Sequence, residues 1–207
     1  NCNHNQLTTL EGCPKEVGGN FNCNHNQLTT LEGCPKEVGG NFNCNHNQLT
    51  TLEGCPKEVG DSFYCNDNLL TTLEGSPKKV GEHFICNKNK LTTLKGCTEE
   101  VGGGFSCLLN ELISLEGGPK KVGSFFDCSS NKLTSLEGYP KELDGYFECW
   151  RNPIENIYNL FGSLKEFQDS MDYGYLRGTD IIKLRFKEAL EEIGVKLPKE
   201  IKGYNYI

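Results

Sequence analysis

Cysteine and histidine recur together in the first part of the chain at a spacing that could hold a metal ion. The motif Cys-x-His occurs three times at a fixed interval, in Cys2 and His4, Cys23 and His25, and Cys44 and His46. Thiolates and imidazoles suit zinc, but a structural zinc site needs about four ligands that converge on one point. The Cys alternates with polar neighbours, as an inward residue of a short strand does, whereas the His lies beyond the strand end. We therefore interpret these residues as core thiols and surface imidazoles, and expect no metal and no cofactor.

The wider distribution of cysteine also argues against a disulfide scaffold. Eight of the twelve Cys recur one period apart, at positions 2, 23, 44, 65, 86, 107, 128 and 149, and four more form a second series at 13, 34, 55 and 97. Ser76, Gly118 and Tyr139 replace Cys in the second series. A position that accepts these residues is not an obligatory half of a disulfide. Because the chain also lacks an Asn-x-Ser/Thr sequon, we predict an intracellular protein with free thiols.

Other functional classes find little support in the sequence. The chain has no G-x-S-x-G, phosphate-loop or H-E-x-x-H motif, so we predict no enzymatic activity and no catalytic residues. Its net charge is −7 with Lys and Arg spread out, whereas nucleic acids and anionic membranes favour a basic face. We therefore expect a protein partner rather than a nucleic acid or a membrane. Repeated Thr pairs such as Thr8-Thr9 resemble those of ice-binding solenoids, which remain a remote alternative.

The repeat itself defines the fold. From Asn1 to Gly60 the sequence repeats with a period of 21, and the frame Phe-x-Cys-x-x-Asn-x-Leu-x-x-Leu-x-Gly-x-Pro-x-x-Val continues to about residue 152. Phe and Cys alternate with polar residues, which predicts a short strand, and Gly and Pro punctuate the remainder of the unit. One unit cannot bury its own apolar side, but stacked units share a core. We predict an array of seven full repeats and a partial eighth over residues 1–152.

This frame resembles the leucine-rich repeat, with Phe and Cys in place of two strand leucines. The resemblance implies a repeat solenoid with a parallel β-sheet on its concave face, and so short a unit leaves room only for turns, extended segments or a second short strand on the convex side. The amino-acid sequence of the repeat also resembles that of leucine-rich repeat proteins of bacteriophages, large DNA viruses or bacteria. An invariant Asn after each strand can bond the turning backbone. We expect these side chains to stack as a structural ladder of Asn5, Asn26, Asn47, Asn68, Asn89, Asn110, Asn131 and Asn152.

Beyond Pro153 the period ends and helical patterning begins, which predicts a helical C-terminal cap over residues 153–207. The stretch 153–173 favours one or two short helices. The clearest helix follows Thr179 or Asp180 as its N-cap and ends at Gly194, with Ile182, Phe186, Leu190 and Ile193 on one side. The tail 198–204 echoes residues 140–146, so we interpret it as a degenerate half-repeat followed by an edge strand.

Sequence differences between the repeats lie at the outward strand positions, because the core positions repeat closely. These positions change from Asn in the early repeats to apolar and aromatic residues later, the types that anchor protein interfaces. We predict a non-catalytic scaffold that binds a protein through this face. The predicted contact residues are Tyr64, His83, Ile85, Leu108, Phe125, Tyr146, Glu148 and Trp150. The alternative is a structural spacer or an assembly component, for example of a virus, that self-associates through its open N-terminal repeat edge.

Overall fold

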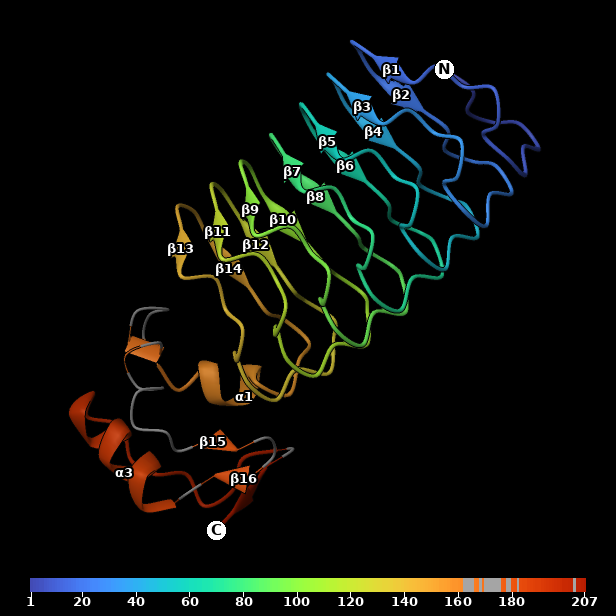
Figure 1. The fold of residues 1–207 in the computed structure, drawn as a ribbon. Helices are drawn as coiled ribbons and strands as arrows, with labels where there is room; N and C mark the ends of the chain where they lie inside the picture. Colours follow the sequence, from blue (N-terminus) through green and yellow to red (C-terminus); the bar gives the residue numbers. More distant parts are fainter. Residues whose placement is uncertain (162–165, 168, 170–175, 178–179, 182, 203) are drawn as a thin grey trace.

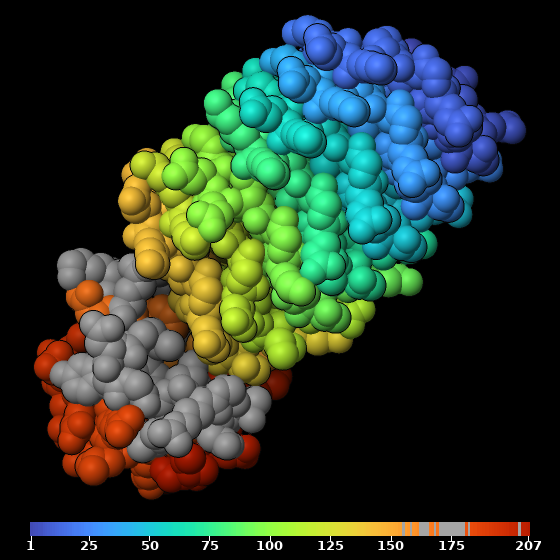
Figure 2. Space-filling view, in the orientation of Figure 1, coloured from blue at the N-terminus to red at the C-terminus, as the bar shows by residue number. Residues whose placement is uncertain are grey.

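The computed structural model is a parallel β-solenoid whose coils each take up one repeat of the sequence (Figure 1). It describes residues 1–161, 166–167, 169, 176–177, 180–181, 183–202 and 204–207. Successive coils stack in sequence order along one direction, and the C-terminal elements lie beyond the last coil. The space-filling view shows the same order as successive bands of colour (Figure 2).

Successive coils contribute successive two-residue strands to two seven-stranded parallel sheets. The first sheet contains β1 (Glu16–Val17), β3 (Glu37–Val38), β5 (Glu58–Val59), β7 (Lys79–Val80), β9 (Glu100–Val101), β11 (Lys121–Val122) and β13 (Glu142–Leu143). The second contains β2 (Phe21–Asn22), β4 (Phe42–Asn43), β6 (Phe63–Tyr64), β8 (Phe84–Ile85), β10 (Phe105–Ser106), β12 (Phe126–Asp127) and β14 (Phe147–Glu148). The predicted Phe-x-Cys strand is thus present, and the remainder of the unit forms a second short strand. Every pairing joins equivalent positions of neighbouring coils, as in Phe21 with Phe42.

Hydrogen bonds between coils extend beyond the assigned strands. Phe42, Cys44 and His46 each donate their backbone N–H to a carbonyl of the next coil, at 2.9–3.1 Å. Cys2 and His4 donate in the same way to the second coil. The first repeat therefore joins the backbone ladder of the second sheet although no strand is assigned to it there.

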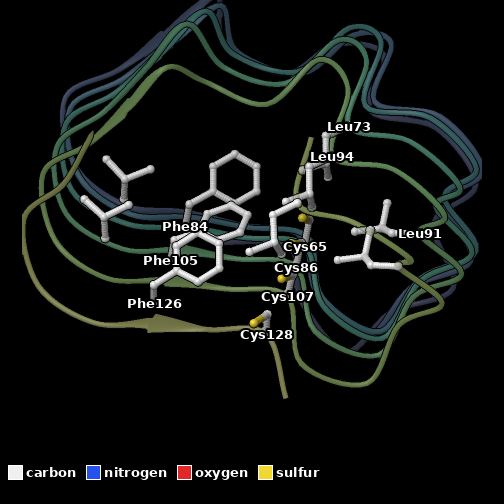
Figure 3. Close-up of a cluster of buried hydrophobic side chains, with 14 of the residues drawn as sticks. Cys65, Leu73, Phe84, Cys86, Leu91, Leu94, Phe105, Cys107, Phe126 and Cys128 are labelled. Carbon is white, nitrogen blue, oxygen red and sulfur yellow. The ribbon is translucent and has the colours of Figure 1, made fainter. Parts of the chain in front are cut away.

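The core consists of columns of identical side chains that stack from coil to coil (Figure 3). In the third repeat Phe42, Cys44, Leu49 and Leu52 have no exposed surface. Successive Phe rings lie 5.1–6.0 Å apart from Phe21 to Phe147. Burying one Phe or Leu side chain contributes about 1.5–3 kcal/mol, and each coil does so only because its neighbours cover it.

The recurrent Asn side chain connects neighbouring coils at the end of each strand. Asn68 donates through Nδ2 to the carbonyls of Cys44 and Cys65, both at 3.1 Å, and its Oδ1 accepts the N–H of Leu49 at 3.0 Å. Asn26, Asn47, Asn89, Asn110, Asn131 and Asn152 make the same contacts in their own coils. Asn5, in the first coil, bonds within its own turn.

The residue before each Asn occupies the left-handed region of backbone conformation. The eight residues of this turn column have φ between 52° and 57°, and they are His4, His25, His46, Asp67, Lys88, Leu109, Ser130 and Arg151. Non-glycine residues adopt such angles only at a cost in energy. The turn tolerates widely different side chains, because its geometry is held by the Asn that follows.

The C-terminal region contains α1 (Glu155–Tyr158), β15 (Leu176–Arg177), β16 (Asp180–Ile181), α3 (Lys183–Glu192) and β17 (Asn205–Tyr206). The three strands form one sheet with β17 at its edge. Phe186 and Leu190 of α3 are buried. The helix ends at Glu192 and is followed by Gly194, where φ is 72°, and the N–H of Val195 donates to the carbonyl of Leu190 at 2.9 Å, a glycine-terminated helix end.

One detail of the predicted helix is wrong. Asp180 does not cap it, because Asp180 lies in β16, where it pairs with Arg177 and Asn205, and α3 begins only at Lys183. Thr179 and Ile182 lie outside the described residues. Asp180 and Ile181 pair instead with Asn205 and Tyr206 near the chain end, a contact that the periodicity of a single segment does not reveal.

Among the described residues, hydrogen bonds and apolar packing attach the C-terminal region to the array. The phenol of Tyr204 donates to the carbonyl of Thr134 at 3.0 Å, and the N–H of Ile154 donates to the carbonyl of Leu133 at 2.9 Å. Ile154, Ile157 and Phe186 belong to the same apolar cluster as the array core. The core thus continues beyond the last coil.

Candidate functional site

The outward face of the second sheet carries three columns of side chains, and we call it the variable face. The first column precedes the buried Phe, the second lies between Phe and Cys, and the third follows Cys. The first column contains Asn20, Asn41, Ser62, His83, Gly104, Phe125 and Tyr146. The second contains Asn22, Asn43, Tyr64, Ile85, Ser106, Asp127 and Glu148, and the third contains Asn24, Asn45, Asn66, Asn87, Leu108, Ser129 and Trp150.

Small polar residues on the variable face are less open than their outward positions suggest. Ser62, Ser106 and Ser129 are 1–7% exposed. Ser62 Oγ accepts the N–H of His83 at 3.2 Å, and Ser106 Oγ donates to Asn87 Oδ1 at 2.7 Å. In the first four coils of the face, the side chains of the first column therefore form hydrogen bonds to the next coil.

His83 ends this structural part of the column. Asn20 Oδ1 accepts the N–H of Asn41, and Asn41 Oδ1 accepts that of Ser62. His83 Nδ1 continues the series by accepting the N–H of Gly104 at 2.8 Å. An imidazole that accepts through Nδ1 carries its proton on Nε2 when neutral. The predicted contact residue His83 thus has a structural role that its residue type did not reveal.

Gly104 leaves space on the surface of the sheet for the ring of Phe125. A Cβ at Gly104 would overlap the ring of Phe125, so the absence of a side chain creates the space that the ring fills. The Phe125 ring lies 5.6 Å from His83 on one side and 5.6 Å from Tyr146 on the other. The structure therefore brings three of the predicted contact residues together in one aromatic row.

The end of the variable face combines exposed aromatic rings with two carboxylates. Tyr146 is 59% exposed and Trp150 is 51% exposed, so the cap leaves both accessible. Asp127 and Glu148 occupy paired positions on β12 and β14. Asp127 Oδ1 accepts the N–H of Ser129 at 2.9 Å. We call Phe125, Asp127, Ser129, Tyr146, Glu148 and Trp150 the C-terminal patch.

The other predicted contact residues do not belong to this patch. Tyr64 and Ile85 are paired neighbours in the second column and are half-buried. Leu108 is half-buried and donates its N–H to Asn87 Oδ1 at 2.9 Å. Sequence reasoning omitted Asp127 and Gly104. Asp127 could have been found because it holds the same place in its repeat as Glu148, whereas the effect of Gly104 depends on how Phe125 packs.

The cysteines lie in two columns that both donate to carbonyls of the next coil. Cys86 Sγ lies 3.3 Å from the carbonyl oxygen of Ser106, and Cys55 Sγ lies 2.9 Å from that of Gly75. Ser76 donates its hydroxyl to Gly96 in the same way at 2.6 Å, which explains why Ser can replace Cys there. Burial raises the pKa of Cys86 well above its usual value, and burial together with Cys13 raises the pKa of Cys34 to about 12. Such thiols are poor nucleophiles.

The histidines of the first three coils form an exposed stack in the turn column. The ring centroids of His4 and His25 lie 4.3 Å apart, and those of His25 and His46 lie 4.1 Å apart. Desolvation, followed by His46 and His4, lowers the pKa of His25, and Asp67 opposes the shift. Among the described residues, no three His, Cys, Asp or Glu side chains are grouped so that they could bind a metal ion.

In each of the Thr pairs, the hydroxyl of the second Thr makes a local hydrogen bond to the backbone. Thr9 and Thr30 accept the N–H of the Glu two positions later through Oγ1, which is a local turn contact. Thr51 and Thr72 do the same, and Thr93 accepts the N–H of Lys95. The hydroxyl of the second Thr of each pair thus has a backbone partner, and Ile113 interrupts the column of the first Thr.

No family model, curated protein or solved structure matches this chain. Within the described part of the chain, the helices are too short or too polar to cross a membrane.

Proposed function

We propose that this protein is a non-catalytic scaffold that binds another protein through the variable face, at its C-terminal patch. The observation that carries the proposal is the exposure of Tyr146 and Trp150 beside the fixed ring of Phe125. Large aromatic rings held in place lose little conformational entropy on binding, and they dominate the energy of many protein interfaces.

We further propose that the chain is a short variant of the leucine-rich repeat, with the variable face concave, and that its relatives are viral or bacterial. The recurrent Phe-x-Cys-x-x-Asn-x-Leu frame and the inter-coil contacts of Asn68 and its equivalents support this assignment. Ser76, Gly118 and Tyr139 stand where other repeats have Cys, which supports reduced thiols and hence an intracellular location, because a replaceable position is not half of a required disulfide.

Affinity capture from the cells that produce the protein tests the proposed scaffold function. Tyr146→Ala removes an exposed ring from the patch, and Ile113→Ala, whose side chain is 63% exposed, removes an exposed apolar side chain elsewhere. We expect the wild type and Ile113→Ala to retain the same protein, identified by mass spectrometry, and Tyr146→Ala to lose it while keeping its circular dichroism spectrum.

The proposal fails if Tyr146→Ala retains the same proteins as the wild type. The spacer alternative predicts a different behaviour, in which no partner depends on the patch and the purified protein self-associates with rising concentration. Sedimentation velocity of the wild type distinguishes the two functions, because a scaffold of this kind remains monomeric without its partner.

A further inference from the structure

We propose that the segment recognised by the C-terminal patch is basic, with an Arg or Lys side chain that contacts Tyr146 or Trp150 and pairs with Asp127 and Glu148. This inference rests on the proposed protein-binding function and specifies the chemistry of its partner. It follows from the charge distribution of the variable face, from the environment of the two carboxylates and from the position of the rings.

The variable face carries no lysine or arginine. Its three columns contain neither residue, although the chain has 21 of them. Lysines lie instead in other columns, where several pair with Glu, as Lys121 does with Glu142 at 2.9 Å. Arg151 follows Trp150 in sequence but belongs to the turn column. A cationic ligand would therefore meet no Lys or Arg side chain on the face itself.

The two carboxylates of the patch have no cationic partner within the described residues. Asp127 and Glu148 lie on adjacent strands in register, about 4.8 Å apart along the sheet. Asp127 is held by the N–H of Ser129 and lies 3.5 Å from the hydroxyl of Ser106. Like charges on paired strand positions repel each other, and a cation between them would relieve this repulsion.

Aromatic residues flank Glu148 on both sides along its strand and Asp127 on one side. Phe125 and Tyr146 precede Asp127 and Glu148 by two positions, and Ser129 and Trp150 follow them by two. Because residues two apart share a face of a strand, all six point from the same side of the sheet. Arg and Lys bind the faces of Trp and Tyr rings while pairing with carboxylates. An arginine or lysine side chain can thus use both parts of the patch.

One polar group of the patch is left without a partner. Ser129 Oγ is buried and is the single such side-chain atom in the described part of the chain that makes no hydrogen bond. It lies in the third column between Leu108 and Trp150. Buried hydroxyls are seldom unpaired, so the patch contains one polar group whose hydrogen bonding is unsatisfied in the free protein.

A fluorescence titration tests this inference, because Trp150 is the one tryptophan of the chain and reports on the patch directly. The probes are three peptides of equal length in which glycine alternates with arginine, glutamine or glutamate. We expect the arginine peptide to change the Trp150 emission in a saturable manner with Kd of about 100 µM or tighter. Its affinity should fall as NaCl rises, since exposed charges are screened, and the other two peptides should leave the emission unchanged.

Variants isolate the contribution of the carboxylates. The double variant Asp127→Asn, Glu148→Gln should bind the arginine peptide at least about 10-fold more weakly, as expected when two charge pairs are lost. Glu116→Gln, which changes an exposed carboxylate away from the variable face, should bind like the wild type. Circular dichroism of all variants shows whether the fold is kept. Equal binding of the glutamine peptide, no response to the arginine peptide, or unchanged affinity in the double variant would overturn the inference.

The same double variant separates this inference from the proposed function in the capture experiment. If the retained protein is lost with Tyr146→Ala but kept with Asp127→Asn, Glu148→Gln, the face binds a protein that is not recognised through basic residues, and only the inference fails. If the retained protein survives both variants, the proposed function fails as well.

Discussion

The side chain of Asn68 holds together four backbone groups that belong to two coils. It donates to the carbonyls of Cys44, Cys65 and Asn66 and accepts one N–H, and only 6% of the residue is exposed. Buried backbone groups that lack partners cost about 1–3 kcal/mol each. An aspartate could accept the N–H of Leu49 but could not donate to the carbonyls of Cys44 and Cys65. Both the nitrogen and the oxygen of the side-chain amide are therefore required.

Replacement of Asn68 by alanine should lower the free energy of unfolding by about 3 kcal/mol, because it leaves several buried backbone groups without partners. Urea denaturation followed by circular dichroism measures the change. Asn24→Ala is the matched control, since Asn24 lies on the variable face, half-buried, and its side chain makes no hydrogen bond in the described structure. A loss at Asn24 equal to that at Asn68 would contradict the assigned role of the ladder.

At the level of strands and turns, glycine sets how closely the coils approach. Gly39, Gly60, Gly81, Gly102 and Gly123 occupy one column after the first sheet, and a Cβ on any of them would collide with the carbonyl oxygen of the glycine one coil earlier. Asp144 occupies this column in the last coil, where its N–H donates to the carbonyl of Val122 at 3.1 Å. Steric fit between backbones, rather than a left-handed conformation, explains these glycines.

Gly102→Ala should therefore lower the free energy of unfolding by about 2–4 kcal/mol, in the range typical of overpacked interior sites. Gly18→Ala provides a control in the same column, because a Cβ at Gly18 meets no atom within 4 Å. Alanine there should be neutral or slightly stabilising, since it restricts the unfolded chain. Chemical denaturation of the two variants gives the comparison, and equal effects would show that backbone contact is not the cause.

The sequence predicts the elements whose characteristic residues recur with the period. It does not predict structure that depends on contacts between distant parts of the chain. Phe and Cys alternation correctly locates the strands β2 to β14 of the second sheet, and the invariant Asn marks the turn after each strand. Periodicity does not show that Asp180 pairs with Asn205 rather than capping α3. On the face, residue type identifies Tyr146 as an exposed aromatic, but it does not reveal that Gly104 provides space for a ring or that His83 accepts a backbone N–H.

The whole molecule is a linear array in which each coil contacts its two neighbours. Its stability should then be close to a sum of coil terms and interface terms. Residues 22–42 repeat residues 1–21 without a change, so their removal joins Phe21 to Asn43 and leaves every later residue with an unchanged local sequence. The array thus offers a deletion that shortens the molecule by one coil and alters nothing else.

Deletion of residues 22–42 should give a folded protein whose denaturant m value is lower by about one tenth, because m follows the surface that unfolding exposes. The emission of Trp150, at the far end of the array, should not change. Deletion of residues 22–41 is the matched control: it removes one residue fewer, so the first coil loses its register with the next. A shift by one position turns inward side chains outward, and we expect the first repeat to detach and become sensitive to protease. If both deletions behave alike, the coils are not held by the periodic contacts of Phe, Asn and Gly, and the additive description of the array is wrong.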